Sequence, residues 1–254
     1  MAESSLSLGY ADFMRETARY LGYSPTSTDW TAAQLSELQQ IVNSGYRQFI
    51  SPPAINGQVH EWSFLAPVTT LVLTADDFDY DLPDDFGAII GVFKFAPDTG
   101  RPNLQYVNEA QLMEKKAITD TNGYPMMFAI RPKSSTGIAG QRFEALFYPE
   151  PDTAYTLHYR YSVNPPKLSD DYPYPLGGMR HAETILQSCL AIAEQRMNDD
   201  AGKDTAKFMQ MLDASVKYDQ VMHAPAFLGY NGDNSNLGGD PIGQSYYVTY
   251  NGSL

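Results

Sequence analysis

The sequence has few of the cysteine and histidine residues that disulfide bonds and metal sites require. Its 254 residues include one cysteine and four histidines. A single thiol excludes a disulfide within the chain and cannot form a metal site alone. This cysteine, Cys189, lies on an apolar helical stripe, and free cysteine is commonly a buried packing residue. We therefore expect Cys189 to be buried and unreactive.

Long apolar runs and positive charge are also scarce. No run reaches the ~18 apolar residues of a membrane-spanning helix, and the N-terminus lacks the basic and apolar regions of a signal peptide. We therefore expect no membrane contact and a cytoplasmic location where the chain is made. Lys and Arg number 17 against 30 Asp and Glu, giving a formal net charge of −13. That balance argues against wrapping nucleic acid. An acidic surface suits solubility, and it would also suit a surface that DNA slides past without sticking, although most acidic proteins never meet DNA.

Catalytic motifs are absent from the sequence. The histidines are not spaced as the His-Glu-x-x-His of a zinc helix; they are His60, His158, His181 and His223. There is no glycine-rich phosphate loop and no Gly-x-Ser-x-Gly nucleophile elbow. Glycosidases use two carboxylates, but among 30 acids no pair stands out. We predict that the chain is not an enzyme and needs no metal and no cofactor.

A cluster of aspartates lies between Asp76 and Asp85. The acids alternate with Phe78, Tyr80 and Leu82, which indicates an edge strand with a charged outer face. A calcium loop is the alternative, but the turn glycine and the distal glutamate of such a loop are missing.

Apolar residues recur at steps of three and four in four segments, the pattern of amphipathic helices. The segments are Tyr10–Leu21, Thr31–Phe49, Gly177–Met197 and Lys203–Met222. The last two are joined by a short polar connector that ends at Gly202, so they should fold back on each other. Each segment has one apolar stripe and a polar back. The four helices must therefore share a core, and we predict one bundle.

Between the helix pairs the pattern changes to short β-type runs separated by turn residues. Strands are expected at His60–Leu65, Thr69–Leu73, Asp77–Asp81, Ala88–Phe95, Met126–Arg131, Arg142–Tyr148 and Tyr155–Val163, with one helix at Asn108–Lys116. Alternation of apolar and polar residues in the last two strands predicts an antiparallel sheet. The expected fold class is α+β: a helical bundle with an inserted antiparallel β-sandwich or barrel and an extended C-terminal arm. The expected parts are the N-terminal helices of the bundle (1–53), the inserted β domain (54–168), the C-terminal helix pair of the bundle (169–222) and the C-terminal arm (223–254).

The C-terminal arm, residues 223–254, is rich in Gly and Asn but keeps several apolar and aromatic residues. These candidate partner-binding residues are Phe227, Leu228, Tyr230, Tyr246, Tyr247, Val248 and Tyr250. The run from Tyr246 to Tyr250 consists of β-forming residues, which can add as a strand to a neighbouring sheet edge. We expect the arm to dock outside its own subunit.

Several short motifs follow one another in a familiar order. They are Tyr20–Tyr23, Trp30–Leu35, Ser44–Phe49 with Pro52 and Pro53, His60–Leu65, Tyr80–Phe86, Tyr159–Tyr161, Pro165–Leu168, Ala193–Arg196 and Lys217–Asp219. In this order, over about residues 8–222, the chain resembles the tailed-bacteriophage head-to-tail adaptor (head completion or connector) proteins. The resemblance lies in the order of these motifs and in the turn residues that separate them. It includes no active-site signature.

The resemblance implies a structural virion protein that forms a ring, usually of twelve subunits, beneath the portal. Such a ring extends the DNA channel and attaches the tail. Its partners would be further copies of the chain, the portal protein and a downstream tail or neck protein, with DNA passing without specific binding. The implied location is the virion neck, and the host cytoplasm during assembly. Two alternatives stay open: another phage tail or neck protein, and a carbohydrate-binding module or carbohydrate-active enzyme built on the β region. Trp30 and Trp62 could stack on a sugar, but we expect them in the core or at an interface.

Overall fold

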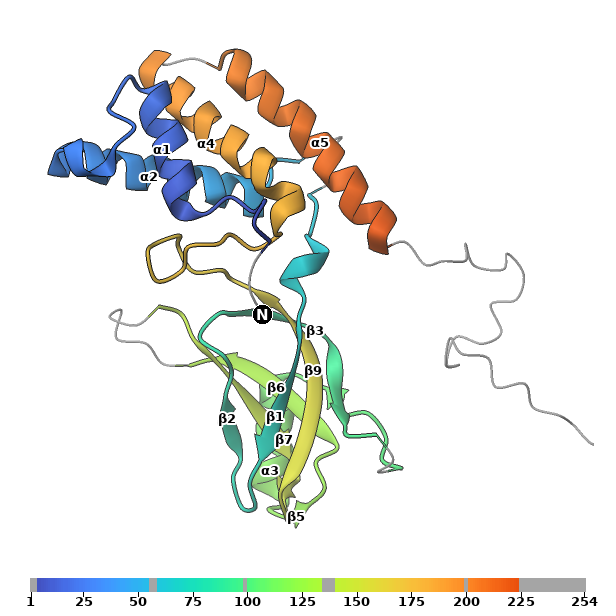
Figure 1. The fold of residues 1–254 in the computed structure, drawn as a ribbon. Helices are drawn as coiled ribbons and strands as arrows, with labels where there is room; N and C mark the ends of the chain where they lie inside the picture. Colours follow the sequence, from blue (N-terminus) through green and yellow to red (C-terminus); the bar gives the residue numbers. More distant parts are fainter. Residues whose placement is uncertain (1–3, 55–58, 98–99, 134–139, 199–200, 224–254) are drawn as a thin grey trace, which may run out of the picture.

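The chain is α+β, with a helical part and a β part (Figure 1). This is a computed structural model, and it describes residues 4–54, 59–97, 100–133, 140–198 and 201–223. Within these ranges, no helix is both long and apolar enough to cross a membrane. The expected insertion of β structure between two helix pairs is confirmed in the order of the elements.

The four predicted main helices are present, with ends within two residues of those expected. They are α1 (Tyr10–Tyr20), α2 (Ala32–Ile50), α4 (Met179–Asn198) and α5 (Lys203–His223). The start of α2 is a capping box: Thr31 Oγ1 accepts from the Gln34 amide, and Gln34 Oε1 accepts from the Thr31 amide. This exchange satisfies two backbone donors that a helix start leaves free.

The turn into α5 is held by Glu194 of α4. Its carboxylate accepts hydrogen bonds from the backbone amides of Gly202, Asp204 and Thr205. These bonds, the one from Thr205 foremost, lower the pKa of Glu194. A negative charge at a helix start also meets the positive end of the helix dipole, so Glu194 fixes how α5 folds back along α4.

All four helices contribute side chains to one hydrophobic cluster. Its members on these helices are Tyr10, Phe13, Met14, Ala18, Leu38, Val42, Tyr46, Phe49, Ile185, Cys189, Ala191, Phe208, Leu212 and Val216. The spacing of apolar residues in the sequence also puts Leu186, Leu190 and Met222 on the buried stripes, and for these three residues the structure differs. Leu186 and Leu190 are only half-buried, while their neighbours Ile185 and Cys189 are fully buried. Met222 is 60% exposed because the last turn of α5 extends past this cluster.

The closest contact between helices joins α2 and α4 at Gly45. A Cβ added to Gly45 would lie 2.6 Å from the Cα of Cys189, well inside van der Waals contact. Next to it, Ser188 Oγ donates to the Gly45 carbonyl at 2.8 Å. Burial raises the pKa of Cys189 to about 12, as expected for a packing thiol. Only glycine at position 45 lets the two helices approach this closely.

The β part has nine strands in the described residues and one helix, α3 (Glu109–Ile118). The strands are β1 (Val68–Leu73), β2 (Asp79–Asp81), β3 (Phe86–Phe95), β4 (Gln105–Tyr106), β5 (Asn122–Gly123), β6 (Met127–Pro132), β7 (Phe143–Tyr148), β8 (Glu150–Pro151) and β9 (Tyr155–Val163). They form sheets of order β1-β9-β3, β2-β7-β6-β4 and β5-β8. The β4–β6 and β5–β8 pairs are parallel and the others antiparallel. The strands do not close into a barrel, so that alternative is wrong.

The two larger sheets share one aromatic core. Phe93 of β3 lies with its ring centroid 4.8 Å from that of Phe128 of β6 and 5.3 Å from that of Phe147 of β7. Phe86 of β3 and Phe143 of β7 add a second contact at 5.5 Å. Edge-on and tilted ring pairs at these distances are the favoured geometries. The alternation predicted for the last two strands concerns only Phe143 and Phe147 among these rings, and for β7 it is wrong in part. Glu144 and Leu146 are buried as well, because the second face of β7 is also covered: Leu146 packs with Leu112 of α3.

One predicted strand is wrong. His60–Leu65 is an extended segment followed by the 3-10 helix η2 (Ser63–Leu65). The reason is tertiary: Trp62 is 2% exposed and packs in the helical cluster instead of a sheet face. The aspartate-rich edge is confirmed, since β2 lies at the end of its sheet with Asp79 and Asp81 exposed. The short strands β4, β5 and β8, of two residues each, were not expected.

The α2–α4 contact gives a stability test. Gly45→Ala should lower the free energy of unfolding by about 2 kcal/mol or more, because the added methyl must push the helices apart. Chemical denaturation measures the change. The matched control is Gly123→Ala, whose added Cβ would be 3.9 Å from its nearest neighbour, Pro149 Cβ. Equal effects of the two substitutions would contradict the close-packed crossing.

Candidate functional site

The partner-binding residues expected from the sequence lie outside the described residues. This holds for Phe227, Leu228, Tyr230, Tyr246, Tyr247, Val248 and Tyr250. Two other features stand out in the described part of the chain. One is an aromatic and polar junction where the β part joins the helices, and the other is a polar groove along α2.

The junction is centred on Trp62. Its ring centroid lies 4.5 Å from that of Phe49, 5.3 Å from that of Phe64 and 5.2 Å from that of His181. Trp62 Nε1 donates to the Phe49 carbonyl at 2.9 Å. This side chain therefore fastens the segment that enters β1 to the end of α2 and the start of α4. Because it is buried, it is not available to stack on a sugar, which removes one support for a carbohydrate-binding module.

A carboxylate of α5 completes the junction. Asp219 Oδ1 accepts from Ser63 Oγ at 2.5 Å, and Oδ2 lies 3.1 Å from the Ser63 amide nitrogen and 2.9 Å from His60 Nε2. Burial by itself would raise the pKa of Asp219, but the hydrogen bonds from Ser63 and His60 outweigh it and lower the pKa. The serine and the histidine both bind the carboxylate, so this is not the nucleophile–base relay of a hydrolase. Its role is to fix α5 to the segment before β1.

His181 is buried in the same junction. Its Nδ1 has no hydrogen-bond partner among the described residues. Burial lowers the pKa of His181; Asp219 opposes this shift, and smaller contributions from His60 and Arg180 add to it. A buried imidazole without a partner for one nitrogen is least costly when neutral. Protonation of His181 therefore opposes folding.

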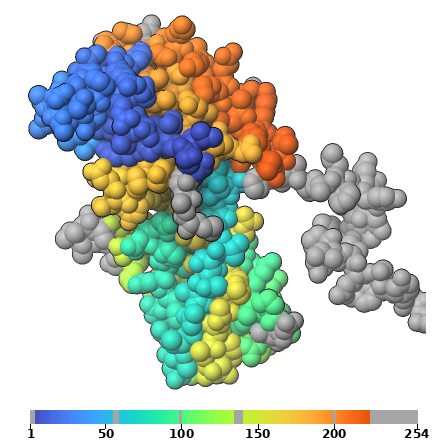
Figure 2. Space-filling model, viewed as in Figure 1, coloured from blue at the N-terminus to red at the C-terminus, as the bar shows by residue number. Residues whose placement is uncertain are grey.

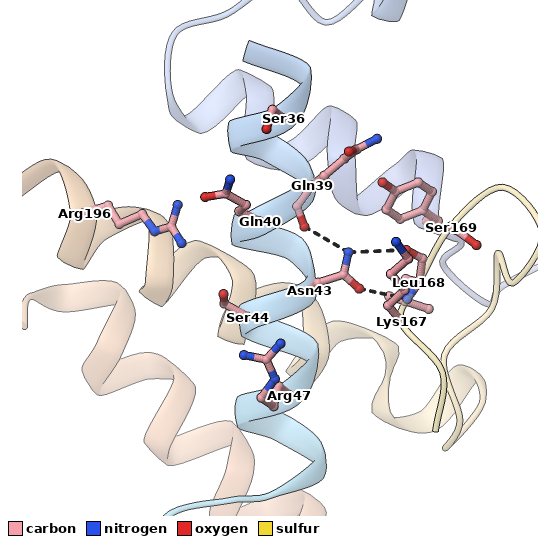
Figure 3. A pocket seen from close by; sticks show the side chains of 11 residues that line it. Ser36, Gln39, Gln40, Asn43, Ser44, Arg47, Lys167, Leu168, Ser169 and Arg196 are labelled. Carbon is pink, nitrogen blue, oxygen red and sulfur yellow. Dashed lines mark hydrogen bonds between the residues drawn. The ribbon is translucent and has the colours of Figure 1, made fainter. Parts of the chain in front are cut away.

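The groove runs along the polar back of α2 and has a volume of about 480 Å³. It is called the α2 groove here and is lined by Tyr10, Ser36, Gln39, Gln40, Asn43, Ser44, Arg47, Lys167, Leu168, Ser169 and Arg196. Figure 3 shows α2 running between Arg196 of α4 and the loop that carries Lys167–Ser169. Three lining residues are cationic and none is acidic, which is notable in a chain of net charge −13.

Asn43 holds one wall of the α2 groove. Its Oδ1 accepts from the Leu168 amide at 2.8 Å, and its Nδ2 lies 3.3 Å from the Leu168 carbonyl (Figure 3). Nδ2 also donates to the Gln39 carbonyl at 2.9 Å. The side chain thus pairs with both backbone groups of a residue that is only 2% exposed. It positions the loop beside α2.

The chemistry of both features is that of contact. Neither brings a nucleophile together with a free base, and within the described ranges no three His, Cys, Asp or Glu side chains are grouped to hold a metal ion. The α2 groove can accept a polar or anionic segment through its guanidinium, ammonium and amide groups. This groove could not be predicted from the sequence, because Arg47, Lys167 and Arg196 come from three distant segments. The only feature that could be read from the sequence was the polar face of the Thr31–Phe49 helix, which predicts that this face is exposed to solvent.

Removing the side-chain amide of Asn43 tests whether it holds the loop beside α2. Asn43→Ala should lower the free energy of unfolding by about 1–3 kcal/mol, since it leaves buried backbone groups of Leu168 without partners. Thermal or chemical denaturation measures it. Gln40→Ala, on the exposed side of the same helix, is the control and should stay within about 0.5 kcal/mol. A loss no larger than that of the control would show that the loop is held by other contacts.

The junction predicts a pH dependence of stability. The pKa of His181 is lower in the folded chain than its ordinary 6.5, so the unfolded chain binds more protons and stability falls as pH drops below about 6.5. His181→Phe keeps a ring but removes this titration. Between pH 7.5 and 5.5 the variant should therefore lose less unfolding free energy than the wild type, as measured by denaturation at each pH. If both proteins lost the same unfolding free energy over this pH range, titration of His181 would not be the cause.

A comparison with known proteins shows to which family the chain belongs. The family model described as SU10 adaptor protein matches residues 9–226, which includes every main helix and both larger sheets. No curated protein matches the chain. The matched range agrees with the resemblance seen in the order of motifs over about residues 8–222. The chain therefore belongs to the SU10 adaptor family, a family of phage head-to-tail adaptor proteins.

Proposed function

We propose that the chain is a head-to-tail adaptor that assembles as a ring beneath the portal. In this role it extends the DNA channel and provides the surface to which a tail or neck protein attaches. The observation that carries the proposal is the family match over residues 9–226. Twelve subunits is the number that the family resemblance implies.

The physical features of the chain agree with a structural role. The junction and the α2 groove contain contact residues in place of a catalytic arrangement, and we propose that the chain has no enzymatic activity. The net charge of −13 disfavours adhesion of DNA to a channel wall, because both carry negative charge. We propose no sequence-specific DNA contact, and a place in the virion neck after assembly in the host cytoplasm.

We propose that the chain is divided into a helical bundle, a β domain and a C-terminal arm. We propose that 1–53 and 169–222 form one four-helix bundle, that 54–168 forms a sandwich-like β domain, and that 223–254 is an arm. Support comes from the single cluster shared by the four helices and from the aromatic core shared by the two larger sheets. The junction around Trp62 fixes the two parts to each other, so that a ring contact made by one part also orients the other.

The arm is proposed to contact partners through its apolar and aromatic residues. It follows α5, whose last turn presents Val221 and Met222 at 72% and 60% exposure. Uncovered apolar side chains at the start of the arm are suited to burial against another protein. Ordering a glycine-rich segment costs backbone entropy, so its docking must be offset by such burial and by main-chain hydrogen bonds.

Deletion of residues 224–254 tests this role. The truncated chain should remain folded with an almost unchanged melting temperature, because the described core is complete without those residues. Its binding to purified portal protein should weaken, which sedimentation of portal with increasing amounts of chain measures. Equal binding by both chains would exclude a docking role for the arm, and failure of the truncated chain to fold would place the arm in its own core.

A further inference from the structure

The sheet edges of the β part differ in how they are protected. Natural proteins protect exposed edges with charge, bulges, very short strands or proline. The edge strand β2 carries Asp79 and Asp81. The edge strand β3 has a register irregularity between Ile90 and Lys94, with Gly91 at a φ of 84°. The edge strand β4 is only two residues long.

Strand β1 has none of these devices. It reads Val-Thr-Thr-Leu-Val-Leu from Val68 to Leu73, without charge, proline or glycine. Six consecutive residues pair with β9, from Val68 opposite Arg160 to Leu73 opposite Tyr155. Its other edge makes no backbone hydrogen bond to another element in the described ranges. A regular, uncharged edge of this length is a template for a further strand.

The side chains of β1 also leave apolar surface uncovered. Val68 is 66% exposed and Val72 is 59% exposed, both on the outer face of the sheet. Figure 2 shows the cyan and teal chain around β1 on the visible surface of the β part, beside the yellow β9. An added strand would place its own side chains next to these valines and bury them.

We propose that the free edge of β1 receives residues 245–250 of a second copy of this chain as an added strand. This rests on the proposed function and names where the arm docks. The segment reads Ser-Tyr-Tyr-Val-Thr-Tyr and, like β1, carries no charge. Its aromatic and β-branched residues favour strand structure, and addition to an edge supplies affinity through main-chain hydrogen bonds.

The length and position of the arm allow exchange between copies. The 21 residues from 224 to 244 can span up to about 70 Å when extended. In the view of Figure 1, α5 ends on the side of the β part where β3 lies, whereas β1 is at the opposite edge of the sheet β1-β9-β3. An arm that docked on its own β1 would have to pass around this sheet. A neighbouring copy in a ring presents its β1 without that detour, and covering this edge is then coupled to assembly.

Disulfide trapping between two tagged copies of the full chain tests the inference. One copy carries Thr70→Cys, and the other carries Tyr246→Cys, Val248→Cys or Tyr250→Cys, so that different registers are sampled. Residues opposite each other on paired strands have Cβ atoms about 4.5–5.5 Å apart, within reach of a disulfide. Cys189 is fully buried and should stay out of the reaction. The chains are mixed with purified portal, oxidised, and analysed without reductant.

We expect a covalent pair of differently tagged chains for at least one arm position. The matched control replaces Thr70→Cys by Asp79→Cys, on the protected edge strand β2, and should give no such pair. Three results would overturn the inference: no pair with any arm cysteine, an equal yield with Asp79→Cys, or, when both cysteines are in one chain, a bond only within that chain. Images of the same samples separate the two proposals, since rings without the pair refute only docking at β1, and absence of rings refutes the ring.

Discussion

The fold of the helical part depends on the close approach of α2 and α4 at Gly45 and Cys189. A glycine facing a small buried thiol lets two backbones come within a distance that any larger side chain would prevent. Ser188 adds a hydrogen bond to the Gly45 carbonyl at the same level. Once this crossing is set, the start of α4 lies beside the end of α2, and the rest of the molecule is built on that pair.

Three features follow from the crossing. His181 and Phe49 come together to receive Trp62, which fastens the segment before β1. Glu194, at the other end of α4, holds the start of α5, and Asp219 then binds Ser63 and His60. The helices and the β part are thus connected through packed rings and a buried carboxylate. For a subunit of an assembly, such a connection transmits the position of one part to the other.

Periodicity in the sequence was sufficient to locate α1, α2, α4 and α5, because each has a continuous apolar stripe. It also located the charged edge at β2, where aspartates alternate with aromatic residues. The predicted strand at His60–Leu65 was wrong, because Trp62 packs in the helical cluster and Ser63–Leu65 forms a 3-10 helix. The burial of Cys189 was predicted and is confirmed. The spacing did not show that Leu186 and Leu190 of the same helix are only half-buried, since the crossing at Gly45 sets the rotation of α4. The α2 groove could not be predicted, because its cations meet only through tertiary structure.

Electron microscopy of purified chain and purified portal protein shows whether this adaptor-family chain forms a ring on the portal. Class averages of portal alone are compared with those of portal mixed with an excess of the full chain. We expect an additional closed ring of density, coaxial with the portal channel and present at one end only. Averages identical to those of portal alone, or chains bound singly without a ring, would contradict it.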